Sequence, residues 1–316
     1  MDTLLDLEEK IRTTTSALGK LEQSFAQNPS RGMHANILSL RKLHTNLQGE
    51  FKDAADAAGM DVCQYRLLND RPSVLALTGV LGAFQEAFSQ AFEAVHSMRR
   101  KDRRVISSAS QRLSTLEVAY SFPGSFGLAF TIPNDKFLLP NMTNSIDRAA
   151  TSILDVVTSH ASLSSVSEMI RTMGRAPVAA IYEWANVSTK FDAGAGIQWE
   201  RGDRIKANVI VQAQEFAEVS GALEVRSETT TEEISVVGVL VGANVRSGTF
   251  QFLPTGADEA LRGTFTDAIS ETQQVKLPSR YLAHMQKNSV LRLATNTESN
   301  TYFLEKLEVI DSTHEG

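Results

Sequence analysis

The chain has 316 residues, 42% of them hydrophobic and 22% charged, which is typical of a globular protein with a buried core. Its net charge of −6 argues against a protein built mainly to coat nucleic acid or an anionic membrane, although a local basic patch stays compatible with it. Cys63 is the one cysteine, and the chain has neither a secretion signal at its acidic start nor a long apolar run. We therefore expect a cytoplasmic protein without intramolecular disulfides and without a membrane partner.

Residues 1–60 predict an antiparallel, coiled-coil-like helical hairpin. Apolar residues recur at heptad spacing on both sides of the helix-breaking segment QNPSRG (27–32), with Thr14 and His44 at polar positions of the seam. The seam is thin, so we expect the hairpin to need a partner, either the rest of the chain or a second copy. The apolar seam positions for pairing or self-association are Leu4, Leu7, Ile11, Leu18, Leu21, Ile37, Leu40 and Leu47.

Residues 61–230 predict a mixed domain in which strands and helices do not strictly alternate. Strand patterns lie at 62–68, 115–122, 126–132, 196–200 and 204–211, and helical patterns at 73–98, 142–190 and 212–220. A doubly wound sheet would need regular alternation of the two, so we assign the fold class α+β. The phenylalanine stripe on the helix over 73–98 is more typical of a core than of a cofactor groove.

Residues 231–316 predict a small β-barrel. Strand patterns near 234–244, 248–253 and 260–265 precede a helical pattern near 279–286 and strand patterns near 289–295 and 301–309. Gly238 and Gly242 lie in the long first strand, where glycine permits the bend that a small closed barrel needs. This order of three strands, a helix and two strands resembles the OB-fold over about the last 85 residues. An SH3-like barrel gives a similar pattern.

The sequence carries no recognisable catalytic, cofactor or metal motif. The six histidines lack ligand spacing, and the P-loop and dinucleotide-binding patterns are absent. Ser125 lies in a G-S-x-G turn, which is not a nucleophile elbow. Asp192, Glu200 and Asp203 flank a hairpin turn, where solvated carboxylates are more common than a metal site. We expect no cofactor, no metal and no enzymatic activity; a site assembled from distant residues of the middle domain is the alternative.

A basic cluster follows the phenylalanine-rich helix, and it consists of Arg99, Arg100, Lys101, Arg103 and Arg104. Cations are favoured at a helix C-terminus, which explains the cluster without a ligand. The alternative is a patch that contacts nucleic-acid phosphates beside the OB-like barrel. Residues 232–316 hold seven Lys and Arg against eleven Asp and Glu, so the barrel itself is a poor phosphate trap.

Taken together, these patterns favour a non-enzymatic interaction or adaptor protein. In this hypothesis the helical hairpin self-associates or docks a protein partner, while the other two domains present further surfaces. Chains of this general build are similar to regulatory or accessory subunits of bacterial multi-protein systems such as phage defence or toxin–antitoxin sets. The alternative function is nucleic-acid binding through the basic cluster at 99–104 together with the barrel.

Overall fold

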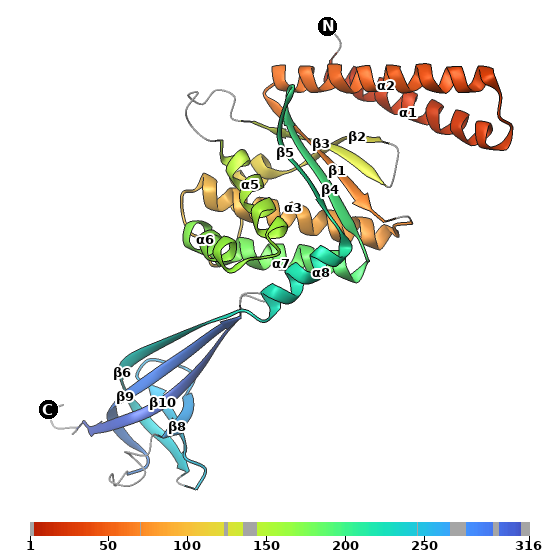
Figure 1. Cartoon of the computed structure of the whole chain (residues 1–316). Coiled ribbons are helices and arrows are strands. Elements are labelled where there is room, and N and C mark those ends of the chain that lie inside the picture. Colours follow the sequence, from red (N-terminus) through yellow and green to blue (C-terminus); the bar gives the residue numbers. More distant parts are fainter. Residues whose placement is uncertain are drawn as a thin grey trace. The chain divides into compact units, whose positions relative to one another are not determined.

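The chain folds into two compact units, Met1–Val225 (unit 1) and Arg226–Gly316 (unit 2). Unit 1 combines helices with a five-stranded sheet, and unit 2 is a closed five-stranded barrel (Figure 1), so the predicted α+β class is confirmed. Among the residues described, no helix has both the length and the apolar character that crossing a bilayer requires. The computed structural model describes residues 3–69, 71–122, 126–134, 144–244, 246–265, 276–292 and 297–310.

The predicted N-terminal helical pair is present as α1 (Leu4–Gln27) and α2 (Arg31–Ala57). Helix α1 begins with a capping box, in which Thr3 and Asp6 each accept a hydrogen bond from the other's backbone amide. Both polar seam positions, Thr14 and His44, are buried. The Thr14 hydroxyl donates to the Lys10 carbonyl within its own helix, so the seam tolerates this polar side chain without a partner on α2.

The sheet of unit 1 is antiparallel throughout, in the order β2-β3-β1-β4-β5. Side chains alternate along β1, so Cys63 and Tyr65 face one side of the sheet while Val62 faces the other. The strands are β1 (Met60–Leu68), β2 (Glu117–Phe122), β3 (Gly127–Pro133), β4 (Gly194–Arg201) and β5 (Arg204–Val211).

Helices cover one face of the sheet and build the larger core. The phenylalanine stripe of α3 lies in this core, where Phe84 packs between Tyr65 and Trp184, and Phe88 packs on Trp199 at 5.2 Å between ring centroids. The helices are α3 (Val74–His96), α4 (Ser108–Ser114), α5 (Ser145–Thr158), α6 (Leu163–Met173), α7 (Arg175–Lys190) and α8 (Ala213–Glu224).

The α1–α2 hairpin covers the opposite face of the same sheet (Figure 1). Leu7, Phe51 and Ala55 of the hairpin share a second core with Val62 of β1 and Tyr120 of β2. The Phe51 and Tyr120 rings meet edge to face at 5.2 Å. The hairpin therefore has one side committed to the sheet, which leaves its other side for solvent or for a partner.

His44 makes the stability of the hairpin sensitive to pH. Burial lowers its pKa, and the Thr15 hydroxyl oxygen, which donates to the Ile11 carbonyl, lies within hydrogen-bond distance of Nε2 at 3.0 Å. In the unfolded chain the ring binds a proton near pH 6.5, whereas the folded hairpin resists it. The stabilisation is therefore fully present above about pH 6.5 and is lost as the pH falls below that value toward the lower pKa of the folded state.

We expect His44→Gln to remove this dependence. Wild type should melt at a higher temperature than the variant at pH 7.5, and the gap should narrow at pH 5.5, as measured by circular dichroism. A gap that is unchanged or wider at pH 5.5 would show that protonation of His44 does not oppose folding.

Unit 2 is a closed barrel in the order β10-β8-β7-β6-β9, with β8 and β10 parallel and the other pairs antiparallel. The small-barrel prediction is confirmed, and the parallel pairing of the third strand with the fifth is OB-like. The strands are β6 (Ser227–Asn244), β7 (Thr249–Pro254), β8 (Leu261–Phe265), β9 (Ser279–Arg292) and β10 (Thr297–Val309).

One predicted element of unit 2 is wrong: the segment 279–286 is not a helix but the first half of β9. Tyr281, Ala283 and Met285 alternate into the barrel core at 3%, 0% and 1% exposure, a period of two that a helix would not give. Leu, Ala and Met are good helix formers, and their local preference is overridden by pairing with β6 and β10 on either side.

Candidate functional site

The cysteine of unit 1 is unsuited to nucleophilic chemistry. Cys63 is fully buried, and burial together with the negative charge of nearby Asp61 raises the pKa of its thiol far above neutrality. Within the described ranges no three His, Cys, Asp or Glu side chains converge as a metal site would require. Glu200 instead pairs with Lys52 of α2 at 2.7 Å. Ser125 lies outside the described residues.

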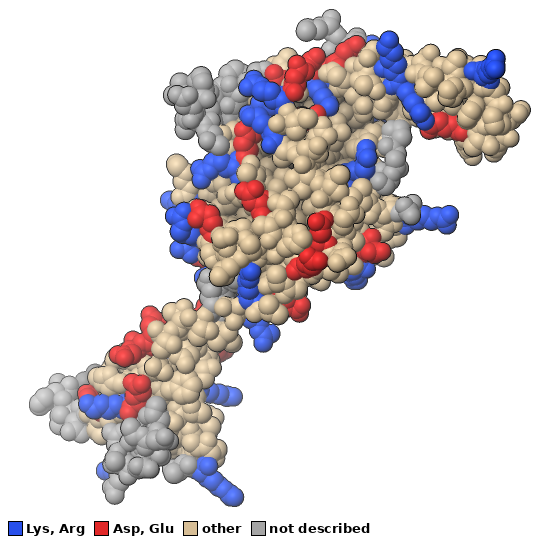
Figure 2. Space-filling view, viewed as in Figure 1, with Lys and Arg blue, Asp and Glu red and all other residues tan. Residues whose placement is uncertain are grey.

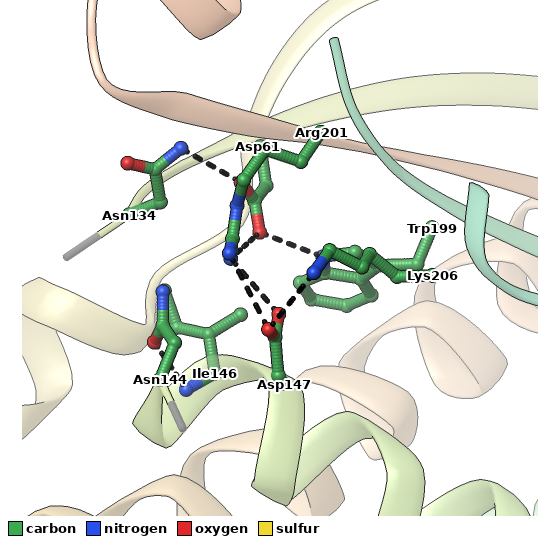
Figure 3. Close-up of polar contacts among 8 residues, drawn as sticks. All are labelled: Asp61, Asn134, Asn144, Ile146, Asp147, Trp199, Arg201 and Lys206. Atoms are coloured by element: carbon green, nitrogen blue, oxygen red, sulfur yellow. Dashed lines mark hydrogen bonds and ion pairs between the residues drawn. The ribbon is translucent and has the colours of Figure 1, made fainter. Parts of the chain in front are cut away.

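A buried ion network lies at one end of the sheet, centred on Asp61 of β1, which has no solvent exposure (Figure 3). The Arg201 guanidinium of β4 donates to both Asp61 oxygens at 2.7 Å, in a bidentate pair. Asn134 Nδ2 and Trp199 Nε1 donate to the same carboxylate at 2.8 and 3.1 Å. Four donors therefore satisfy the carboxylate without any ligand.

Arg201 carries the network on to α5. Figure 3 shows its guanidinium between Asp61 and Asp147, and Nη2 donates to Asp147 Oδ1 at 2.9 Å. Lys206 of β5 also approaches Asp147, at 3.4 Å. Hydrogen bonding to Asp61 raises the pKa of Arg201 further, so the guanidinium stays charged. The network joins β1, β4, β5 and α5, and the full set of donors to the Asp61 carboxylate is typical of a structural clamp, although Asn134 Oδ1 is buried without a hydrogen-bond partner among the described residues.

The basic cluster at 99–104 lies against the junction of α6 and α7. The Lys101 backbone accepts from Ala176 at 2.8 Å and donates to Met173 at 2.7 Å, while its ammonium pairs with Glu93. Gly174, at φ +88°, permits this contact, because a Cβ there would meet the Lys101 backbone at 2.5 Å. The Arg104 guanidinium donates to the Ala179 carbonyl. Arg99, Arg100 and Arg103 are exposed.

In the described part of the barrel no phenylalanine or tyrosine side chain is fully exposed for stacking with bases. Its six aromatic side chains are buried or half-buried, and they are Phe250, Phe252, Phe265, Tyr281, Tyr302 and Phe303. Figure 2 shows Lys and Arg interspersed with Asp and Glu over the visible face of each unit. OB-folds that bind single strands combine exposed aromatic side chains with a basic groove. The described surface of this barrel shows little of either feature.

The eight predicted seam residues lie mainly inside unit 1. Leu7, Ile11, Leu18, Ile37 and Leu47 are buried between the two helices or against the sheet. The remaining three, Leu4, Leu21 and Leu40, are half-buried. The seam thus holds the hairpin together, and a free surface has to be sought on its flanks.

Such a surface lies on one flank of the hairpin, where α1 and α2 line two cavities of about 590 and 750 Å³ that share no lining residue. Two smaller hollows, of about 360 and 240 Å³, lie between α5 and α6 and beside Gln64 of β1. We call the first two together the outer groove; they are lined by Leu4, Asp6, Leu7, Glu9, Lys10, Thr13, Thr14, Leu43, Leu47, Glu50, Asp53, Ala54, Ala57 and Ala58.

The outer groove faces away from the sheet. Lys52 of α2 points toward the sheet, because its ammonium pairs with Glu200 of β4. Successive residues of an α-helix are about 100° apart, so Leu43 and Glu50 lie about half a turn from Lys52. Both line the groove, and Leu43 is 47% exposed. Sequence reasoning missed this surface because Leu43 lies off the seam and reads as an ordinary exposed leucine.

The groove combines an apolar floor with acidic edges. The floor consists of leucine and alanine side chains from both helices. Asp6 and Glu9 lie on the α1 edge and Glu50 and Asp53 on the α2 edge, against Lys10 as the one basic lining residue. Hydrogen bonds from Thr3 lower the pKa of Asp6, so that carboxylate is charged at neutral pH.

Comparisons of the chain with protein-family models, curated proteins and solved structures found no match.

Proposed function

We propose that this chain is a non-enzymatic interaction protein that binds a protein partner through the outer groove of its helical hairpin. The observation that carries the proposal is that Leu43, Ala57 and Ala58 are exposed in the groove of a helix pair whose opposite side already packs on the sheet. We place the protein in the cytoplasm, as an adaptor or accessory subunit of a bacterial multi-protein system of the phage-defence or toxin–antitoxin kind.

The pairing of the buried acidic residues supports binding over catalysis. In the described part of unit 1, Asp61, Glu93 and Glu200 are the buried carboxylates. Each lies within ion-pair distance of a cation, at 2.7, 3.3 and 2.7 Å respectively. A general base needs a carboxylate that faces a substrate, whereas these three face the protein's own cations.

Photo-crosslinking from within the groove tests the proposal. A benzophenone amino acid in place of Leu43 should give covalent adducts with another protein in cells of the native host. The matched control is the same residue in place of Ile205, which is 58% exposed on β5. Adducts from position 43 and none from position 205 support the groove as the binding surface, and absence of adducts from position 43 contradicts it.

Nucleic-acid binding is the second candidate, and the exposure of Arg99, Arg100 and Arg103 is what favours it. Titration of a fluorescent single strand at low salt separates the two functions, because contacts to several phosphates make affinity fall steeply as salt rises. Binding that is lost on charge reversal at these three positions would support the second candidate.

A further inference from the structure

We infer that the outer groove accepts one amphipathic helix of a partner protein, with basic residues along both edges of its apolar stripe. This rests on the proposed function and names the chemistry of the partner. Grooves between two helices commonly take a third helix, whose apolar positions recur every three or four residues.

The length of the groove sets the length of the helix. Its α2 lining runs from Leu43 to Ala58, and its α1 lining from Leu4 to Thr14. The α2 wall spans fifteen residue steps, or roughly 22 Å, and the α1 wall ten steps, or roughly 15 Å, so a partner helix of about three to four turns matches the groove.

The floor of the outer groove determines the apolar stripe that we expect on the partner helix. Ala54, Ala57 and Ala58 line the cavity of about 590 Å³ together with Leu4 and Leu7, whereas Leu43 and Leu47 line the cavity of about 750 Å³. Apolar side chains interdigitate when helices pack. We therefore expect the partner to present apolar residues to both cavities.

The charged residues at the edges of the outer groove determine the charge that we expect on the partner helix. Four carboxylates against one ammonium give the lining a charge of −3, and the carboxylates stand on both helices. Lys or Arg on either side of the partner's stripe would meet Asp6 and Glu9 across one edge, and Glu50 and Asp53 across the other. Such edge contacts mainly set specificity and association rate, and salt screens them.

The same charges disfavour a second copy of the chain as the occupant. Two outer grooves face to face would bring Asp6, Glu9, Glu50 and Asp53 of each chain together, with one Lys10 on either side. Like charges across an interface oppose association. A helix from another protein, of opposite charge, meets no such penalty.

Fluorescence anisotropy on the full chain tests the inference with a labelled 16-residue peptide that carries a Leu/Phe stripe and Lys/Arg edges. Two control peptides keep the length: one has the same stripe with Glu edges, and one is a scramble of the basic sequence. We expect the basic peptide to bind at least tenfold more tightly than either control. Equal binding of the basic and Glu-edged peptides would overturn the inference.

Charge reversal on the protein locates the site. The double variant Glu50→Lys and Asp53→Lys should bind the basic peptide at least tenfold more weakly than wild type does, and it should bind the Glu-edged peptide more tightly. The matched control makes the same charge change outside the groove, with Glu183→Lys and Glu224→Lys on α7 and α8. If both double substitutions weaken peptide binding equally, the attraction is non-specific and the proposed site is overturned. Circular dichroism must show that both variants are folded.

The outcomes separate the inference from the proposed function. If position 43 gives adducts but the chain does not prefer the basic peptide, the groove remains the proposed binding surface and the basic partner helix is rejected. Failure of both experiments would reject both. A dimer in light scattering that Leu43→Glu converts to a monomer would assign the groove to a second copy and reject the partner helix.

Discussion

Asp61→Ala is expected to lower the free energy of unfolding of unit 1 by about 3–5 kcal/mol. The substitution removes a fully buried carboxylate that accepts from Arg201, Asn134 and Trp199. Its donors lose their acceptor, and they are left facing a site that water enters poorly. Both tryptophans, Trp184 and Trp199, lie in unit 1, so urea unfolding followed by tryptophan fluorescence measures this loss.

The control is Asp147→Ala at the other end of the same guanidinium. Asp147 is 20% exposed, and its removal leaves the bidentate pair of Asp61 and Arg201 in place. We expect a loss of about 1 kcal/mol, near the upper value for partly solvated ion pairs. Losses of equal size for the two variants would mean that burial of Asp61 does not set the strength of the network.

Gly238→Ala is expected to destabilise unit 2 by about 1–3 kcal/mol, as overpacking in a core does. A Cβ at Gly238 would lie 2.2 Å from the Leu253 carbonyl oxygen and 2.7 Å from the Phe252 ring. The backbone of β6 or β7 must move to relieve the contact. Hydrogen exchange of peptides from unit 2, read by mass spectrometry, should show faster exchange in the variant.

Gly242 provides the matched control in the same strand. A Cβ there would meet Gln251 Cβ at 3.6 Å, which is ordinary contact, so Gly242→Ala should change stability by less than about 0.5 kcal/mol. Equal acceleration of exchange in both variants would contradict the close packing of β6 on β7 at Gly238.

Local periodicity predicted much of this architecture. Heptad spacing identified both helices of the hairpin, because apolar residues on one face of a helix recur every three or four residues. Alternation did the same for β1, β4 and β5, and glycine in a long strand pointed to a barrel. The failure at 279–286 arose where good helix formers occur at alternate positions, so only pairing with neighbouring strands decides the element.

The ion network and the outer groove could not be predicted from the sequence, because both depend on how distant segments pack together. Asp61, Asp147 and Arg201 are far apart in the chain, and their meeting depends on how β1, β4 and α5 pack together. The flank of the hairpin that stays open depends on which flank the sheet covers. The signal available was modest: Leu43 off the seam, with Glu50 and Asp53 on the same side of α2.

The Gly238 comparison also refines the barrel prediction. Sequence reasoning gave Gly238 and Gly242 one role, that of permitting a bend. The structure separates them, because Gly238 is a point of close approach, whereas the pairing of β6 with β7 shifts register between Leu240 and Gly242. Glycine in ordinary contact with a side chain and glycine pressed against a backbone look alike in a sequence, and they tolerate substitution very differently.

The most direct test of a partner helix in the outer groove is competition for the photo-crosslink from position 43. Host cell extract is irradiated with the benzophenone-bearing chain at rising concentrations of the basic peptide or of its Glu-edged counterpart. We predict that adduct yield falls with the basic peptide and stays constant with the Glu-edged one. Adducts that persist at saturating basic peptide, or that fall equally with both peptides, would contradict the account.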